Sequence, residues 1–208
     1  GSNNTVHGLG ANIVGGCNNT ARNSYSTVVG GYVLSAAGNC SFIGGGYCSV
    51  TTTNFGVIVG GCGNTVTKGA AASTIGGGDT NTTCGPCSYI GGGKTNAIHA
   101  DGWYGSLAGG QFGCIKACHS GVASGFCNHV CASFGFIGGG CCNCVSNCTF
   151  EGSSIMGTDI TAVSGRTFHT NRLWLSADGC GCSLPISDPK VEGMVYRSGN
   201  DLKISTGP

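Results

Sequence analysis

Charge is scarce in this chain, and its scarcity excludes several classes of protein. Lysine and arginine contribute 9 of the 208 residues, and aspartate and glutamate contribute 8. This is about a third of the usual charged share. Without a run of basic residues, the chain lacks the electrostatic footprint of a nucleic-acid-binding protein. No apolar run approaches the roughly 18 residues that cross a bilayer, so we expect no membrane insertion.

Glycine and cysteine are abundant instead. Glycine contributes 42 residues and cysteine 16, whereas glycine usually supplies about 7% of a chain. Collagen requires glycine at every third position, and that period is absent. A helical fold is disfavoured because glycine destabilises helix interiors. The low charge also argues against disorder, which is typical of highly charged chains with few β-branched residues.

A repeat of about 15 residues organises most of the chain. Each copy has an apolar residue two positions before an origin, which is Gly15 in the first copy and Gly157 in the last. Successive origins are separated by 15 residues, twice by 17 and finally by 18. The apolar column is Ile13, Val28, Ile43, Ile58, Ile75, Ile90, Leu107, Val122, Ile137 and Ile155.

Two further columns share the face of the first. Six residues after each origin stand Ala21, Ala36, Thr51, Val66, Thr83, Ile98, Ile115, Val130, Val145 and Val163. Two residues before this column, asparagine recurs at Asn19, Asn64, Asn81, Asn96, Asn128 and Asn143. Side chains in strands alternate, so these even offsets point inward and odd offsets point outward. We expect the asparagines to form amide ladders.

The spacing predicts an all-β fold, a parallel β-solenoid or β-roll of about ten 15-residue coils. Two inward apolar residues per copy make no core alone, but stacked copies align them at about 4.8 Å. We expect the solenoid over residues 7–165 and a C-terminal strand and hairpin cap over 166–208. In that cap, residues 194–197 and 202–205 alternate around a Ser-Gly-Asn-Asp turn, which predicts a small β-hairpin.

The unit S-x-I-G-G-G-x-x-N-x-A resembles two kinds of protein. One is the head of trimeric autotransporter adhesins, and the other is the repeat region of phage tail fibres and virion spikes. The segment Ser154–Leu175 and the proline turn beginning at Leu184 look like the closing part of phage fibre proteins. The resemblance implies a homotrimer on the virion surface that attaches to a host glycan or protein receptor. The alternatives are a bacterial cell-surface adhesin head and a self-assembling extracellular structural filament.

Two insertions lengthen the regular stack, and inserted loops commonly carry binding residues. The insertion Lys68–Ala72 contains a lysine and otherwise only small residues. The segment from His99 to Tyr104, in contrast, combines Asp101, Trp103 and Tyr104 with a histidine. An aromatic platform beside polar groups suits a sugar. The alternative is that both aromatic rings pack between subunits. Trp174 lies between two leucines, which favours packing.

Each cysteine within the repeats can be placed by its distance in residues from the repeat origin. Most of them stand at odd distances, which point outward. Cys127 and Cys142 share one slot in successive coils, and a separation near 4.8 Å suits a disulfide. Cys84 and Cys87 have the spacing of a redox motif, at a coil corner instead of a helix start. Cys84, Cys87, Cys180 and Cys182 are further disulfide candidates, the last two beyond the repeats. Disulfides and free thiols both stay open as interpretations.

A metal site is the least favoured reading of the cysteines. Its candidate ligands are Cys127, His129, Cys142 and Cys144, four corners of one outward patch that zinc would take tetrahedrally. We expect no cofactor and no enzymatic activity, because no pair of acids suits glycoside hydrolysis. The acids are Asp79, Asp101, Glu151, Asp159, Asp178, Asp188, Glu192 and Asp201.

Overall fold

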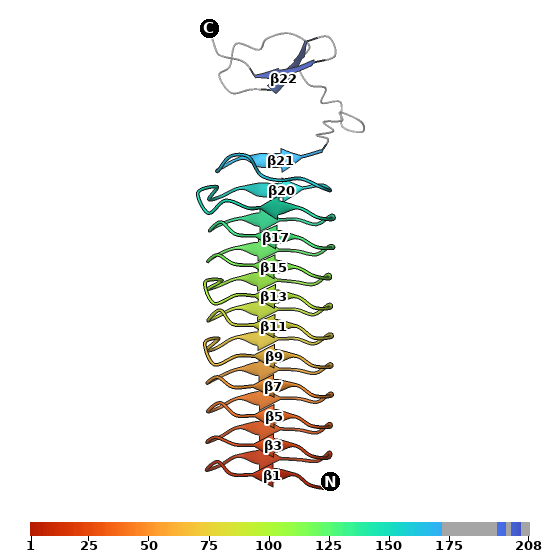
Figure 1. Cartoon of the computed structure of the whole chain (residues 1–208), viewed down its shortest axis with the longest axis vertical. Coiled ribbons are helices and arrows are strands. Elements are labelled where there is room, and N and C mark those ends of the chain that lie inside the picture. Colours follow the sequence, from red (N-terminus) through yellow and green to blue (C-terminus); the bar gives the residue numbers. More distant parts are fainter. Residues whose placement is uncertain (172–194, 199–200, 205–208) are drawn as a thin grey trace. The chain divides into compact units, whose positions relative to one another are not determined.

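The computed structural model describes residues 1–171, 195–198 and 201–204 of the chain. The chain divides into two units, Gly1–Asn171 and Arg172–Pro208. The first unit is a parallel β-solenoid, as predicted (Figure 1). In the second, β22 (Val195–Ser198) pairs antiparallel with β23 (Asp201–Ile204), which confirms the predicted hairpin. None of the described residues forms a helix able to cross a membrane.

Two parallel sheets run the length of the solenoid, and each coil adds one strand to each sheet. The first sheet contains β1 (Thr5–Val6), β3 (Thr20–Ala21), β5 (Ser35–Ala36), β7 (Val50–Thr51), β9 (Thr65–Val66), β11 (Thr82–Thr83), β13 (Ala97–Ile98), β15 (Cys114–Ile115), β17 (His129–Val130) and β19 (Cys144–Val145). The second sheet contains β2 (Asn12–Ile13), β4 (Thr27–Val28), β6 (Phe42–Ile43), β8 (Val57–Ile58), β10 (Thr74–Ile75), β12 (Tyr89–Ile90), β14 (Ser106–Leu107), β16 (Gly121–Val122), β18 (Phe136–Ile137), β20 (Ser154–Met156) and β21 (Phe168–Thr170). The second sheet thus extends past residue 165, where we expected the cap to begin.

The core consists of the two predicted apolar columns facing each other. From Val28 to Ile155 the first column is almost fully buried, and Ile13 is half-buried because it belongs to the terminal coil. The second column is buried from Ala21 to Val145. Equivalent residues pair directly between coils, as Ile75 does with Ile90. The inward assignment is therefore confirmed for both columns up to the last coil.

In the last coil, the inward assignment of Val163 was wrong. Val163 is 76% exposed, and Ala162 is 1% exposed in its place. The cause is a corner that is one residue shorter than the others. Gly157 accepts a hydrogen bond from the Asn143 amide, the role that Gly140 has for Asn128 in the preceding coil. The repeat origin in this coil is consequently Met156 instead of Gly157.

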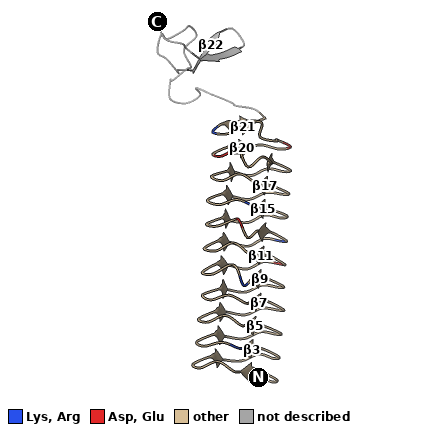
Figure 2. Ribbon diagram, turned by 60° about the vertical axis from the view of Figure 1, so that its left-hand side comes forward, with Lys and Arg blue, Asp and Glu red and all other residues tan. Residues whose placement is uncertain are grey.

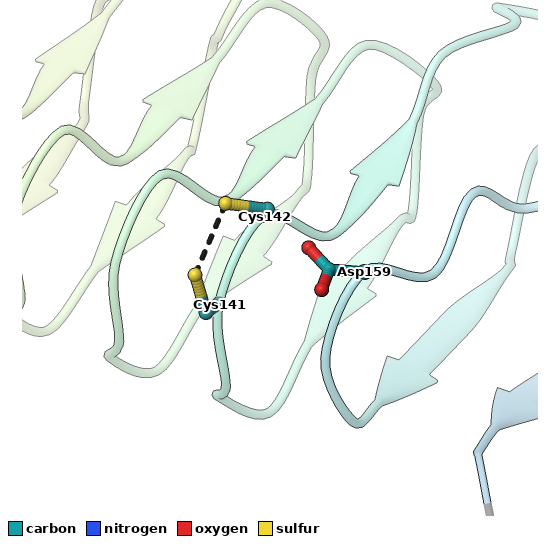
Figure 3. A group of neighbouring side chains, drawn as sticks. All are labelled: Cys141, Cys142 and Asp159. Atoms are coloured by element: carbon teal, nitrogen blue, oxygen red, sulfur yellow. Dashed lines mark hydrogen bonds between the residues drawn. The ribbon is translucent and has the colours of Figure 1, made fainter.

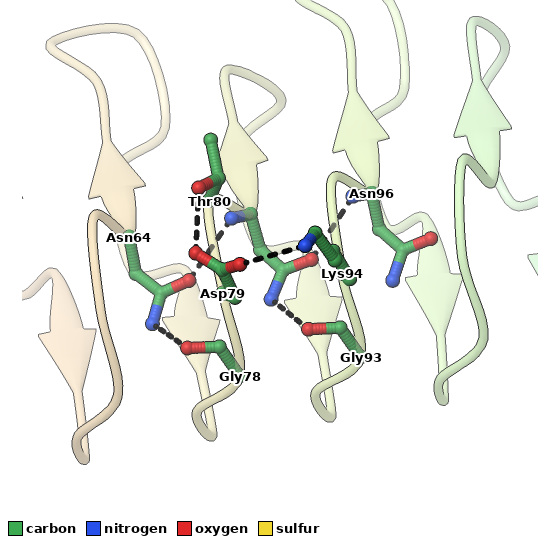
Figure 4. A network of polar contacts seen from close by, with 8 residues as sticks. Asn64, Gly78, Asp79, Thr80, Gly93, Lys94 and Asn96 are labelled. Atoms are coloured by element: carbon green, nitrogen blue, oxygen red, sulfur yellow. Dashed lines mark hydrogen bonds and ion pairs between the residues drawn. The ribbon is translucent and has the colours of Figure 1, made fainter.

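The buried asparagines hold each coil to the next through backbone atoms. Asn81 Nδ2 donates to the carbonyl of Gly77 in its own coil (3.0 Å) and to that of Gly93 in the next (3.0 Å). Its Oδ1 accepts from the backbone N–H of Asn96 at 2.9 Å (Figure 4). The expected contact between amides occurs once in this column, from Asn143 to Asn128. The column is thus a ladder from amide to backbone.

A third row of contacts closes each coil where it turns through its glycines. Single residues two positions after each origin pair in parallel, for example Tyr32 with Tyr47. The glycine before each of them lies in the left-handed region, as Gly78 does with φ of 88°. A Cβ on Gly78 would lie 2.1 Å from the carbonyl oxygen of Gly93 in the next coil. A larger residue would therefore push the coils apart.

The inserted residues all lie at one corner, between a strand of the first sheet and the following strand of the second. They follow β9, β13 and β19 and appear as enlarged loops along one edge of the solenoid (Figure 1). The third of them explains the 18-residue spacing, because residues 146–152 are longer than the equivalent turn elsewhere. The stack therefore accepts extra residues along one edge without loss of register.

The asparagine ladder leads to a first prediction. Asn81→Ala would leave the N–H of Asn96 and the carbonyl of Gly77 without their partners, and the carbonyl of Gly93 would keep only its bond from the N–H of Asp79. We expect the free energy of unfolding to fall by about 2–4 kcal/mol. Asn39→Ala is the control because the Asn39 side chain is exposed. Chemical denaturation would measure both, and equal effects of the two changes would contradict the ladder's role.

A buried hydroxyl without a partner leads to a second prediction. Thr51 is fully buried between Ala36 and Val66, and its Oγ1 has no hydrogen-bond partner. Thr51→Val removes this hydroxyl, so we expect a gain of about 1 kcal/mol. Thr83 occupies the same column, but its hydroxyl contacts Ser88. Thr83→Val should be neutral or destabilising, and a stability loss in Thr51→Val would refute the argument.

Candidate functional site

The loop between β13 and β14 presents its predicted binding residues to solvent. His99, Asp101, Trp103 and Tyr104 are all exposed. The loop folds as two successive turns, in which the N–H of Gly102 bonds the carbonyl of His99 at 2.9 Å. The Trp103 carbonyl accepts from the N–H of His119 in the next coil at 2.8 Å. The loop backbone is therefore fixed by the coils on either side, while its side chains stay accessible.

An aromatic stack continues from this loop along the corner. The Tyr104 ring lies 4.9 Å from that of His119, and His119 lies 5.2 Å from Phe134. These rings border a groove of about 470 Å³ whose floor includes Ser106 and Gly121. Sequence reasoning missed His119 and Phe134, although both stand five residues before a repeat origin, as Tyr104 does. That shared slot is the signal that would have found them.

The four loop residues differ in their surroundings. Tyr104 lines the groove, whereas Trp103, His99 and Asp101 do not. The Trp103 side chain is 54% exposed and stacks on no ring among the described residues. The structure therefore separates the predicted set into a ring packed along the corner and a tryptophan that projects from it.

Every cysteine in the described part of the chain is a free thiol, and none is buried. Outward placement was predicted and is confirmed. Cys127 and Cys142 occupy equivalent corner positions with φ of 55° in successive coils. A disulfide between them stays a prediction for oxidising conditions, as it does for Cys84 and Cys87. Cys180 and Cys182, like Trp174, lie outside the described residues.

The thiols on the outer face of the first sheet are held in their neutral form. Burial is the main cause that raises the pKa of Cys114 and of Cys144, and nearby Cys131 adds to it. Lys116 acts in the opposite direction on both. Thiolates are the nucleophiles and metal ligands. Nucleophilic attack or metal binding at either cysteine would therefore first require loss of the thiol proton.

The predicted metal patch is not assembled as a ligand set. No three of Cys127, His129, Cys142 and Cys144 bring their ligand atoms within 4.8 Å of one another. Instead, within the described residues, Cys142 gathers with Cys141 and Asp159 (Figure 3). The Sγ atoms of the two cysteines are 3.0 Å apart. Sequence reasoning missed this group because the shortened corner hid the register of Asp159.

Charged residues are sparse along the solenoid, where few ribbon segments are blue or red (Figure 2). Lys94 Nζ lies 3.4 Å from Asp79 Oδ2, in the row of single-residue bridges. A hydrogen bond from Thr80 and the contact with Lys94 lower the pKa of Asp79. Both side chains are exposed, and exposed ion pairs contribute little to stability. The pair is a local surface contact between two coils.

Comparisons with known proteins leave the family of this chain open. The chain matches no protein-family profile and no curated protein. The resemblance to fibre and adhesin repeats therefore rests on the form of the repeat.

Proposed function

We propose that this chain is a non-enzymatic structural module of a virion fibre or spike, which assembles as a homotrimer and attaches to a host surface. Assembly uses the outer face of the second sheet, and attachment uses the loop from His99 to Tyr104. The observation that carries the proposal is the uncharged outer face of the second sheet, on which several large apolar side chains are exposed. A bacterial adhesin head is the alternative setting for the same assembly.

The second-sheet face is defined by two outward columns. The first is Asn12, Thr27, Phe42, Val57, Thr74, Tyr89, Ser106, Gly121, Phe136 and Ser154. The second is Val14, Val29, Gly44, Val59, Gly76, Gly91, Ala108, Ala123, Gly138 and Met156. Neither column contains a charged residue, whereas Arg22 and Lys116 flank the first sheet and Asp79 lies in the row of bridges.

Several large apolar side chains on this face are exposed in the single chain. Val14 is 67% exposed, Val59 55% and Met156 53%. Exposed apolar side chains on a face without charge indicate a candidate interaction site. The groove beside Tyr104 opens on the same face, where Ser106 and Gly121 are small. A partner's larger side chain would fill that hollow.

The dimensions of the second-sheet face suit a second copy of the chain. Ten coils at about 4.8 Å give a face about 48 Å long. With a width of about 12 Å, the face covers roughly 600 Å², which the two neighbours in a trimer would share; this is below the ~800 Å² per partner of a standard interface, so surface beside the face would contribute as well. Equivalent faces on identical chains match in length and coil spacing. Closed cyclic symmetry satisfies each face without leaving an open polymer.

The assembly is tested by a charge on this face. Val59→Lys would place an ammonium group inside the proposed interface, so we expect self-association at least about tenfold weaker. Thr52→Lys is the control, because Thr52 is exposed beside the first sheet of the same coil. Native mass spectrometry and sedimentation would measure both. A monomeric wild-type chain, or equal effects of the two changes, would contradict the proposal, and polymers of variable size would favour a structural filament.

Attachment is assigned to the loop because Trp103 is exposed and fixed in place. Its backbone carbonyl is bonded to the next coil, and its ring is free to stack. Exposed Asp101 supplies a carboxylate two residues away. A rigid aromatic surface beside a hydrogen-bond acceptor suits the apolar face and hydroxyls of a sugar. We therefore propose a host-surface glycan as the receptor.

Glycan binding is tested by removing this ring. Trp103→Ala is expected to reduce binding on a glycan array at least about tenfold, because ring stacking carries the contact. Tyr25→Ala is the matched control, since Tyr25 is an exposed aromatic residue at the same corner in a coil without an insertion. Unchanged binding in Trp103→Ala would remove this site from the proposal.

A further inference from the structure

Three potential metal ligands meet at the corner that joins the last two coils. Cys141 belongs to the row of single-residue bridges, where it pairs with Phe126. Cys142 follows it with φ of 55°, and Asp159 holds the same corner position one coil later, also with φ of 55°. The N–H of Asp159 bonds the Cys141 carbonyl at 2.8 Å. Backbone contacts therefore fix the three residues relative to one another.

The ligand atoms already lie close to a coordinating arrangement. Both Sγ atoms and a carboxylate oxygen of Asp159 lie within 4.8 Å of one another (Figure 3). Zinc–sulfur bonds of about 2.3 Å in a tetrahedron separate the two sulfurs by about 3.8 Å. The observed Sγ separation is 3.0 Å, so a small rotation of either side chain would suffice. All three side chains are exposed or half-buried, which leaves a path for an ion.

The charge at this corner is unbalanced. Within the described part of the chain, the Asp159 side chain makes no hydrogen bond or ion pair. A hydrogen bond with Cys141 is the main cause that raises the pKa of Cys142, and the negative charge of Asp159 adds to it. A bound dication would neutralise the carboxylate and favour both thiolates. Cys127, at the same position one coil earlier, also interacts with the Cys142 thiol.

We propose that Cys141, Cys142 and Asp159 bind one thiophilic divalent cation, with zinc as the ion whose ligand preferences fit best. Two sulfurs and one carboxylate oxygen leave a fourth position for water or for the Cys127 sulfur. The site joins a regular coil to the irregular last coil, where the corner is one residue shorter. The bound ion would thus act as a clamp at this end of the solenoid.

Cobalt(II) titration of the reduced full chain tests the site. We expect one tightly bound ion per chain, with the absorption of a cobalt–thiolate bond. The double change Cys141→Ser and Cys142→Ser should weaken this binding at least about 100-fold, because both sulfur ligands are lost. The control is Cys84→Ser with Cys87→Ser, which also removes two corner thiols and should leave binding intact. Zinc should raise the Tm of the wild type and of this control, but not of the first double variant.

Changes at Asp159 decide the question if the double variant fails to fold. Asp159→Asn should weaken cobalt binding about tenfold, and Asp159→Cys should strengthen it by supplying a third thiolate. Unchanged cobalt binding in the Cys141 and Cys142 variant would overturn the proposal. Equal losses in both double variants would also overturn it, because they would indicate diffuse binding to many thiols.

Discussion

The solenoid depends on backbone hydrogen bonds between successive coils. A typical N–H bonds a carbonyl 14 residues later, as Gly76 does with Ile90 at 2.8 Å. Strands of two residues have almost no stability alone, so each coil becomes stable only when its neighbour supplies partners and buries the same apolar slots. The asparagine ladder bonds the same backbone at the corner. Even the residues held at positive φ, such as Tyr104 and Cys142, are kept there by hydrogen bonds to the previous coil.

The inward columns could be predicted because the two-residue alternation of a strand and the 15-residue repeat assign the same residues to the core. Ile75 and Val66 needed only their offsets from a glycine pair to be placed in the core. Val163 could not be placed, because the missing corner residue follows Ile155 and leaves no mark in the 18-residue spacing, which the insertion after β19 explains. The partners of the asparagines were equally hidden, since their amides reach carbonyls at a corner whose geometry appears only when coils are stacked.

The alignment of residues between successive coils also explains why the sequence predicted only some of the residues in each candidate site. Cys142 was placed outward at the correct slot, and its neighbour Cys141 was placed in the turn. Asp159 was counted from Gly157, so its alignment with Cys142 was missed. With Met156 as the origin, Asp159 falls three residues after it, as Cys142 does after Gly139. The loop that contains Tyr104 was recognised from its composition. The stacking of Tyr104 on His119 could be found only by aligning successive coils.

The three enlarged loops share one edge, and the coil rise sets the distances between them. The loops after β9 and β13 are two coils apart, and the loop after β19 follows three coils later. At about 4.8 Å per coil, these intervals are about 10 and 14 Å. Equivalent side chains on a solenoid are therefore separated along its axis by whole multiples of the coil rise. Duplication or loss of a 15-residue unit would change the spacing of two displayed groups without altering either group.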